Sequence, residues 1–126
     1  IGDCVMAVFI WDYHLDRAID ASIAIRNSIN NLPTENGFSP NVSIGINSGE
    51  MISGNIGSAT LKRLDFTVIG DTVNTAQRLQ SAASIGQIII NETCYEKVKT
   101  SFKFEKIGAI SLKNKTEKIV IYEVIS

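Results

Sequence analysis

The sequence is poor in the residues that build metal clusters, disulfide frameworks and nucleic-acid surfaces. Its 126 residues include one histidine and two cysteines, Cys4 and Cys94, which are far apart and form no CxxC pair. The two separate cysteines predict reduced thiols. A single histidine provides few of the residues that a zinc site or a Ser-His-Asp relay needs. The 12 basic and 13 acidic residues nearly balance, so no basic stripe predicts nucleic-acid binding. No apolar run approaches the length of a membrane span, and no signal peptide is apparent.

What is present is ordinary for a globular protein. Hydrophobic residues make up 44% of the chain and charged residues 20%, and 126 residues are enough for one domain, 1–126, with a core of its own. The chain opens inside what looks like a hairpin and without an initiator methionine, so we expect it to be part of a longer protein.

Hydrophobic periodicity predicts alternating strands and helices. After a Gly2-Asp3 turn, the run from Cys4 to Ile10 predicts a strand, and a helix is expected from about Leu15 to Asn31. The expected buried side of that helix is Ala18, Ala21, Ile25, Ile29 and Leu32, broadened by Ile23. Further strands are expected at 42–46, 87–90, 102–105, 107–112 and 119–124, with a short helix capped by Asn91 that runs to about Lys99.

This order of elements, with antiparallel hairpins at both ends, predicts the fold class. We expect an α/β (α+β) sandwich of ferredoxin-like character, in which helices pack on one face of an antiparallel-rich sheet.

The stretch 66–78 combines a short strand, a glycine break and the start of a helix. Asp71 or Thr72 is expected to cap that helix, whose buried face would consist of Val73, Ala76, Leu79 and Ala83. Asn74 and Arg78 are four residues apart, so their side chains lie one above the other near the helix start. An amide and a guanidinium placed in this way are suited to hold an anion. An ordinary polar helix face has the same spacing.

Other candidate groups are weaker when each is taken alone. Gly49 and Gly54 have the spacing of a phosphate loop, but the Lys-Ser/Thr that should follow is missing, so this is not a Walker motif. Asp3 lies in a predicted turn and could hold Mg²⁺, although turn aspartates are common. Lys113 could meet phosphate or be solvated.

Several of these segments occur in one order and resemble the catalytic domain of class III adenylate/guanylate cyclases over the whole chain. They are GDCVMAVF at 2–9, SIGINSG at 43–49, GNIG at 54–57, FTVIGDTVN at 66–74, Arg78-Leu79 and Leu112-Lys113. The resemblance implies the nucleotide cyclase catalytic fold without its N-terminal strand and first helices. It also implies an intramolecular reaction, in which the ribose 3′-oxygen attacks the α-phosphorus and pyrophosphate leaves.

The resemblance assigns roles to the residues at matching positions. Asn74 would orient the ribose, and Arg78 would stabilise the phosphorus during transfer. Asp3 would bind one of two Mg²⁺ or Mn²⁺ ions, whose other aspartate, like a base-reading lysine, would precede Ile1.

Three further residues would bind the substrate. Thr67 takes the base-reading position as in bacterial-type adenylate cyclases, which favours ATP. Lys113 would hold the terminal phosphates, as would Arg63, for which Lys62 is an alternative. Asn114 replaces the glycine that is usual in this turn.

In this family the site lies between two catalytic domains, so the resemblance implies a head-to-tail homodimer. Asp3 would come from one copy and Thr67, Asn74 and Arg78 from the other, and the chain alone would be inactive. We expect an adenylate cyclase in intracellular signalling, controlled by upstream sensor domains, that is cytoplasmic or the cytoplasmic part of a membrane-anchored protein. The alternatives are a guanylate cyclase and a non-catalytic cyclase-homology module that dimerises or binds nucleotide.

Overall fold

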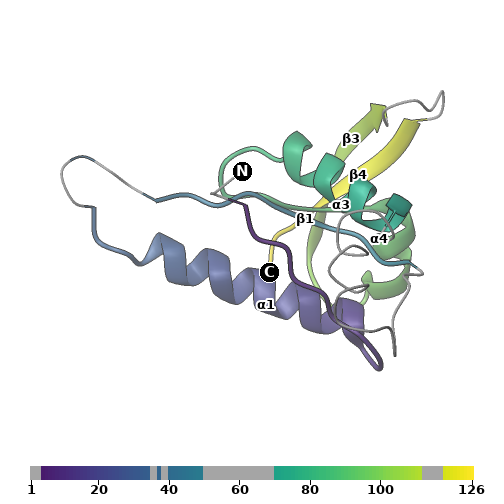
Figure 1. The fold of residues 1–126 in the computed structure, drawn as a ribbon, viewed down its shortest axis with the longest axis horizontal. Helices are drawn as coiled ribbons and strands as arrows, with labels where there is room; N and C mark the ends of the chain where they lie inside the picture. Colours follow the sequence, from purple (N-terminus) through teal and green to yellow (C-terminus); the bar gives the residue numbers. More distant parts are fainter. Residues whose placement is uncertain (1–3, 35–36, 38–39, 50–69, 112–117) are drawn as a thin grey trace, which may run out of the picture.

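A computed structural model describes residues 4–34, 37, 40–49, 70–111 and 118–126 (Figure 1). In chain order the elements are α1 (His14–Asn30), β1 (Ile44–Ile46), α3 (Gly70–Ala82), β2 (Ile88–Asn91), α4 (Glu92–Val98), β3 (Phe104–Ser111) and β4 (Lys118–Val124). In Figure 1, α1 lies along one side of the molecule and the β3–β4 hairpin extends from the other. In these ranges, no helix is long and apolar enough to cross a bilayer.

The described strands form one mixed sheet in the order β1-β2-β4-β3. β1 and β2 are parallel, while the β2–β4 and β4–β3 pairs are antiparallel, so the expected antiparallel-rich sheet is confirmed. The register shifts between Lys106 and Gly108. The structure has the single strand β3 in place of the two strand pieces expected there, and the register shift lies near the predicted break between them.

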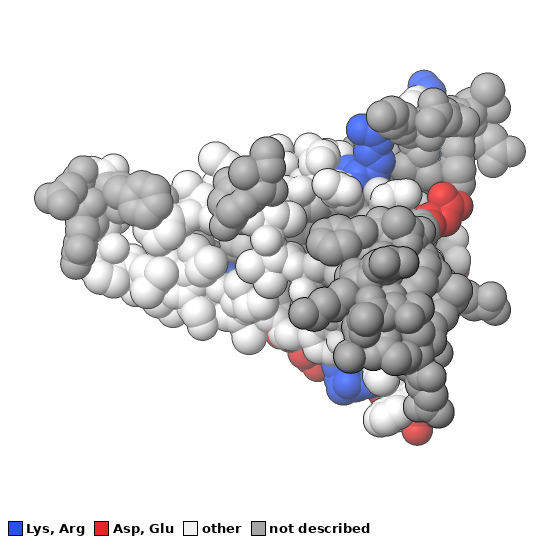
Figure 2. Space-filling view, in the orientation of Figure 1, with Lys and Arg blue, Asp and Glu red and all other residues white. Residues whose placement is uncertain are grey.

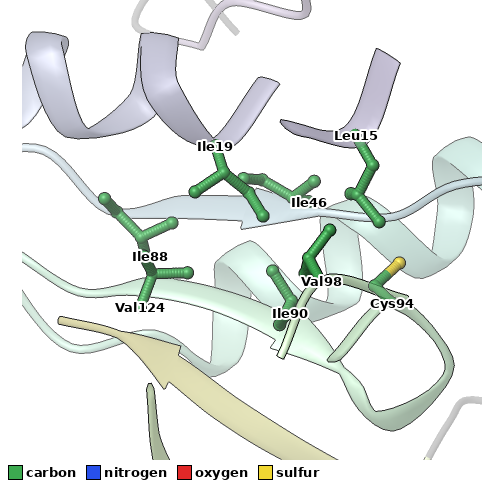
Figure 3. Close-up of a cluster of buried hydrophobic side chains, with 8 residues drawn as sticks. All are labelled: Leu15, Ile19, Ile46, Ile88, Ile90, Cys94, Val98 and Val124. Carbon is green, nitrogen blue, oxygen red and sulfur yellow. The ribbon is translucent and has the colours of Figure 1, made fainter. Parts of the chain in front are cut away.

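Helices cover both faces of the sheet, which corrects the expectation of one covered face. Ile88 and Ile90 of β2 pack in a cluster with α1 and α4 (Figure 3), whereas Ile89 packs against Leu79 of α3. Successive strand residues point to opposite faces, and Ile88, Ile89 and Ile90 are all fully buried. A continuous apolar run is what a strand covered on both sides requires.

The bounds expected for α1 are confirmed, and its expected buried face is confirmed in part, because Ala18 packs against the core cluster and Ala21 and Ile29 are half-buried. Leu15, Ile19 and Ser22 are buried, while Ile25 and Leu32 are about half exposed. Apolar residues occur all around this helix, so its apolar pattern does not single out one face. Two polar residues on the side that faces the sheet donate hydrogen bonds to backbone carbonyls. The Ser22 hydroxyl donates to the Ala18 carbonyl, and the Arg26 guanidinium donates to the carbonyls of Val124 and Ile125.

The segment 4–10 forms no strand, contrary to expectation. Its side chains are largely exposed, with Val5 at 91%, and a broad uncharged surface lies over this part of the molecule in Figure 2. Strand-forming residues become a strand only when a neighbour takes their backbone hydrogen bonds. None of the described strands pairs with this segment.

Candidate active site

The helix α3 carries the two candidate residues that the structure describes. It begins at Gly70, so Asp71 and Thr72 lie in its first turn and not before it as expected. Leu79 is fully buried, as predicted, and packs with Ile89 and Ile121. The other residues of the expected buried face, which are half-buried, are Val73, Ala76 and Ala83.

Asn74 and Arg78 lie one turn apart on α3, outside the hydrophobic clusters. Asn74 is exposed and Arg78 is half-buried. This placement leaves the amide accessible to a ligand and partly removes the guanidinium from water, where a charged hydrogen bond is stronger. An amide can orient a hydroxyl or an ether oxygen, and a guanidinium can stabilise charge on a phosphoryl group.

Gly45 of β1 lets the backbone of α3 lie directly against the sheet. A Cβ atom at this position would overlap the Ala76 carbonyl oxygen and the Gln80 amide nitrogen. Since the residues between Asn74 and Gln80 form less than two helical turns, Gly45 lies beneath the same part of α3 that holds the candidate pair. The glycine therefore fixes how close that part of the helix sits to the sheet.

A second connection joins the end of β1 to the first turn of α3. The Asn47 amide donates through Nδ2 to the Thr72 carbonyl, over 3.1 Å, and its Oδ1 accepts from Asn91 Nδ2, over 2.8 Å. The Asn91 side chain also caps α4, as predicted, by accepting from the backbone N–H of Cys94. Sequence reasoning missed Asn47. The sequence feature that could have indicated it is an asparagine placed directly after the last residue of a buried strand.

The surroundings of Asn47 are largely buried. Cys94 is 1% exposed, and burial raises the pKa of its thiol against the opposing effects of a backbone hydrogen bond at Ser48 and the charge of Lys97. The protonated thiol faces Asn47 Oδ1 at 3.8 Å. His14 begins α1, and its Nε2 lies 2.7 Å from Ser48 Oγ.

The remaining predicted site residues fall outside the described ranges, so the structure does not place them. These residues are Asp3, Arg63, Thr67 and Lys113. In the part of the chain that is described, no group of three or more His, Cys, Asp or Glu side chains could hold a metal ion. A carboxylate such as Asp3 is a suitable donor for Mg²⁺ or Mn²⁺, but one carboxylate does not make a site.

Comparison with known proteins gives one family. The profile of the adenylate and guanylate cyclase catalytic domain matches residues 1–126. An adenylate cyclase of Anabaena cylindrica is 33% identical over 141 residues, covering 98% of this chain and 27% of that protein. One from Mycobacterium tuberculosis is 30% identical over 102 residues, covering 81% of this chain and 22% of its own length. The chain thus spans about a quarter of these curated relatives.

Solved structures share the fold. The guanylate cyclase domain from Catenaria anguillulae, in complex with GTP, superposes with a TM-score of 0.74 at 30% identity, over 93% of this chain and 62% of that one. An adenylyl cyclase from P. aeruginosa gives a TM-score of 0.70 at 29% identity, over 90% of this chain and 59% of the other. A guanylyl cyclase domain from Blastocladiella emersonii, which forms a non-canonical dimer, gives a TM-score of 0.72 at 29% identity, over 93% of this chain and 61% of the other.

Proposed function

The chain belongs to the adenylate and guanylate cyclase catalytic domain family, and we propose that it is the catalytic domain of an adenylate cyclase. The reaction would convert ATP to 3′,5′-cyclic AMP and pyrophosphate. The ribose 3′-oxygen forms a bond to the α-phosphorus, the bond to pyrophosphate breaks, and the hydroxyl proton is released. The observation that carries this proposal is the Asn74–Arg78 pair. The two residues lie one turn apart on α3 and outside the hydrophobic clusters.

The two side chains would divide the work of orientation and charge stabilisation. The exposed Asn74 amide would hold the ribose so that its 3′-oxygen lies in line with the α-phosphorus, which lowers the entropic part of the barrier. The half-buried Arg78 guanidinium would donate to the phosphoryl oxygens as negative charge accumulates there. Because this contact strengthens in the transition state, it should act on turnover more than on substrate binding.

The remaining roles rest on sequence resemblance. Thr67 would read the adenine, and Arg63 and Lys113 would hold the β- and γ-phosphates. Asp3 would contribute to the binding of two Mg²⁺ or Mn²⁺ ions, which supply activation of the nucleophile and neutralisation of the leaving pyrophosphate when they are bound.

We propose that two copies assemble head to tail, so that Asp3 of one copy completes a site with Asn74 and Arg78 of the other. The Blastocladiella emersonii domain, which forms a non-canonical dimer, supports self-association of this fold, and the head-to-tail arrangement rests on the sequence resemblance. A cytoplasmic location and upstream sensor domains that adjust the dimer belong to the same proposal. The 126 residues alone would be inactive.

The preference for ATP is supported by Thr67 and by the adenylate cyclase relatives that align over most of the chain. GTP is the second candidate, because the superposed Catenaria anguillulae domain binds it. The test is to incubate the intact protein with ATP or GTP, in Mg²⁺ and in Mn²⁺, and to identify the products by mass spectrometry. Cyclic AMP from ATP is expected. Cyclic GMP as the main product would replace the assigned substrate, and no cyclic product from either nucleotide would contradict the enzyme assignment.

A further inference from the structure

We infer that Asn47 is a positioning residue, which sets the first turn of α3 and through it the placement of Asn74 and Arg78. The inference rests on the proposed function for its catalytic consequence. Asn47 itself does not need to touch substrate. It lies directly after β1 and is half-buried, and Thr72, whose carbonyl it binds, is two residues before Asn74.

Both ends of the Asn47 amide are used, and each end has a different neighbour. Nδ2 donates to the Thr72 carbonyl of α3, and Oδ1 accepts from Asn91 Nδ2 at the cap of α4. With the amide reversed, two NH₂ groups would face each other at Asn91 and two oxygens at Thr72. The arrangement therefore accepts one orientation, and that orientation fixes the first turn of α3 relative to the ends of two parallel strands.

Among the described residues, hydrophobic packing does not supply the same restraint at this end of α3. The fully buried residue of the helix, Leu79, lies near its C-terminal end, and Val73 in the first turns is half-buried. Gly45 lies against the backbone at Ala76 and Gln80, one turn and two turns beyond Thr72. The close approach at Gly45 sets the distance between α3 and the sheet. The directional hydrogen bond from Asn47 instead sets the position of the first turn of α3.

The chain after β1 makes a second close approach at the same place. A Cβ atom on Gly49 would lie 2.5 Å from Thr72 Oγ1. Asn47 thus binds the Thr72 carbonyl, and the position of Gly49 beside the Thr72 side chain leaves no room for a larger residue. A shift of about 1 Å in a catalytic group can cost on the order of 100-fold in rate, so a restraint two residues before Asn74 has kinetic consequences.

The test compares Asn47→Asp with Asn27→Asp in the intact protein. Asn47→Asp keeps the size and the acceptor for Asn91 but removes the donor to Thr72, while Asn27 is exposed on α1 and undergoes the same change of charge away from α3. We expect Asn47→Asp to lower kcat about 10- to 100-fold with KM changed less than about threefold. Asn27→Asp should retain wild-type kinetics. Asn47→Ala should behave like Asn47→Asp.

Hydrogen exchange measured by mass spectrometry gives a readout that does not depend on cyclase activity. Loss of one hydrogen bond predicts exchange about 2- to 10-fold faster in a peptide that covers the start of α3, with α4 unchanged because Asn91 still caps it. Unchanged exchange at α3 would overturn the inference, as would normal kcat in a variant whose α3 exchanges faster. If wild-type protein makes no cyclic nucleotide, the proposed function fails, and exchange at α3 still decides whether Asn47 restrains the helix.

Discussion

On one face of the sheet, α1 and α4 share a cluster of eight buried residues, whereas α3 on the opposite face shares a cluster of three in the described part of the chain. The stacked rings of Tyr95 and Tyr122, whose centroids are 3.7 Å apart, are partly buried and pack against the larger cluster. Burial of apolar area is the main source of stability. Among the described residues, the face covered by α1 and α4 should therefore contribute more to the free energy of unfolding.

The α3 face depends on closer and more directional contacts. Gly45 brings the helix backbone against β1, and Asn47 binds its first turn. Both contacts fall on residues 72–80 of α3, the part of the helix that also carries Asn74 and Arg78. Stability and the placement of the candidate site thus depend mainly on different faces of the sheet, so substitutions on the two faces should have separate effects.

The largest expected effect is that of Arg78→Ala on turnover in the intact protein. Loss of a donor to the transition state predicts kcat about 100- to 1,000-fold lower, with a modest change in KM. Arg78→Lys should recover little, because an ammonium does not reproduce the planar fork of donors. Gln77→Ala, an exposed neighbour on the same helix, is the matched control. Normal turnover in Arg78→Ala would remove the assigned role.

A change on the opposite face should affect stability and leave turnover intact. Ile19 of α1 is fully buried, so Ile19→Ala should lower the free energy of unfolding by about 2–5 kcal/mol, as measured by urea denaturation. The folded fraction should keep the wild-type kcat. Ile25→Ala on the exposed side of α1 should change stability by no more than about 0.5 kcal/mol. Equal losses at both positions would contradict the observed face of α1.

A smaller change in stability, now coupled to activity, is expected for Gly45→Ala. The added methyl group would push α3 away from β1, which should cost about 1–3 kcal/mol in the free energy of unfolding and lower kcat about 10- to 100-fold. Ile44→Val, next to it but on the α1 face, should cost about 0.5–1.5 kcal/mol without a change in kcat. An equal loss of kcat in Gly45→Ala and Ile44→Val would contradict the assignment of site placement to the α3 face.

Local signals in the sequence predicted several elements well. Asn91 followed by Glu92 predicts the start of α4, and the run Ile88–Ile90 predicts a buried strand, because capping and burial depend on adjacent residues. Spacing also predicted that Asn74 and Arg78 lie one turn apart on one helix, as they do on α3, and their roles stay a prediction.

Features set by distant parts of the chain were not predicted. The buried face of α1 depends on Arg26 reaching the carbonyls of Val124 and Ile125, which are about 100 residues away. The segment 4–10 has strand-forming residues but no described neighbour that completes a ladder. The bond between Asn47 and Thr72 likewise joins residues 25 apart in sequence, a pairing that no periodicity shows.

The central claim is that Arg78 of one copy acts with Asp3 of another, and mixing two inactive variants tests it most directly. Intact protein with Asp3→Ala and intact protein with Arg78→Ala should each be nearly inactive. After subunit exchange in equal amounts, cyclic AMP formation should return to about a quarter of the wild-type rate, because half of the dimers are mixed and each has one complete site of two. No recovery in a mixture that demonstrably forms mixed dimers would contradict the account.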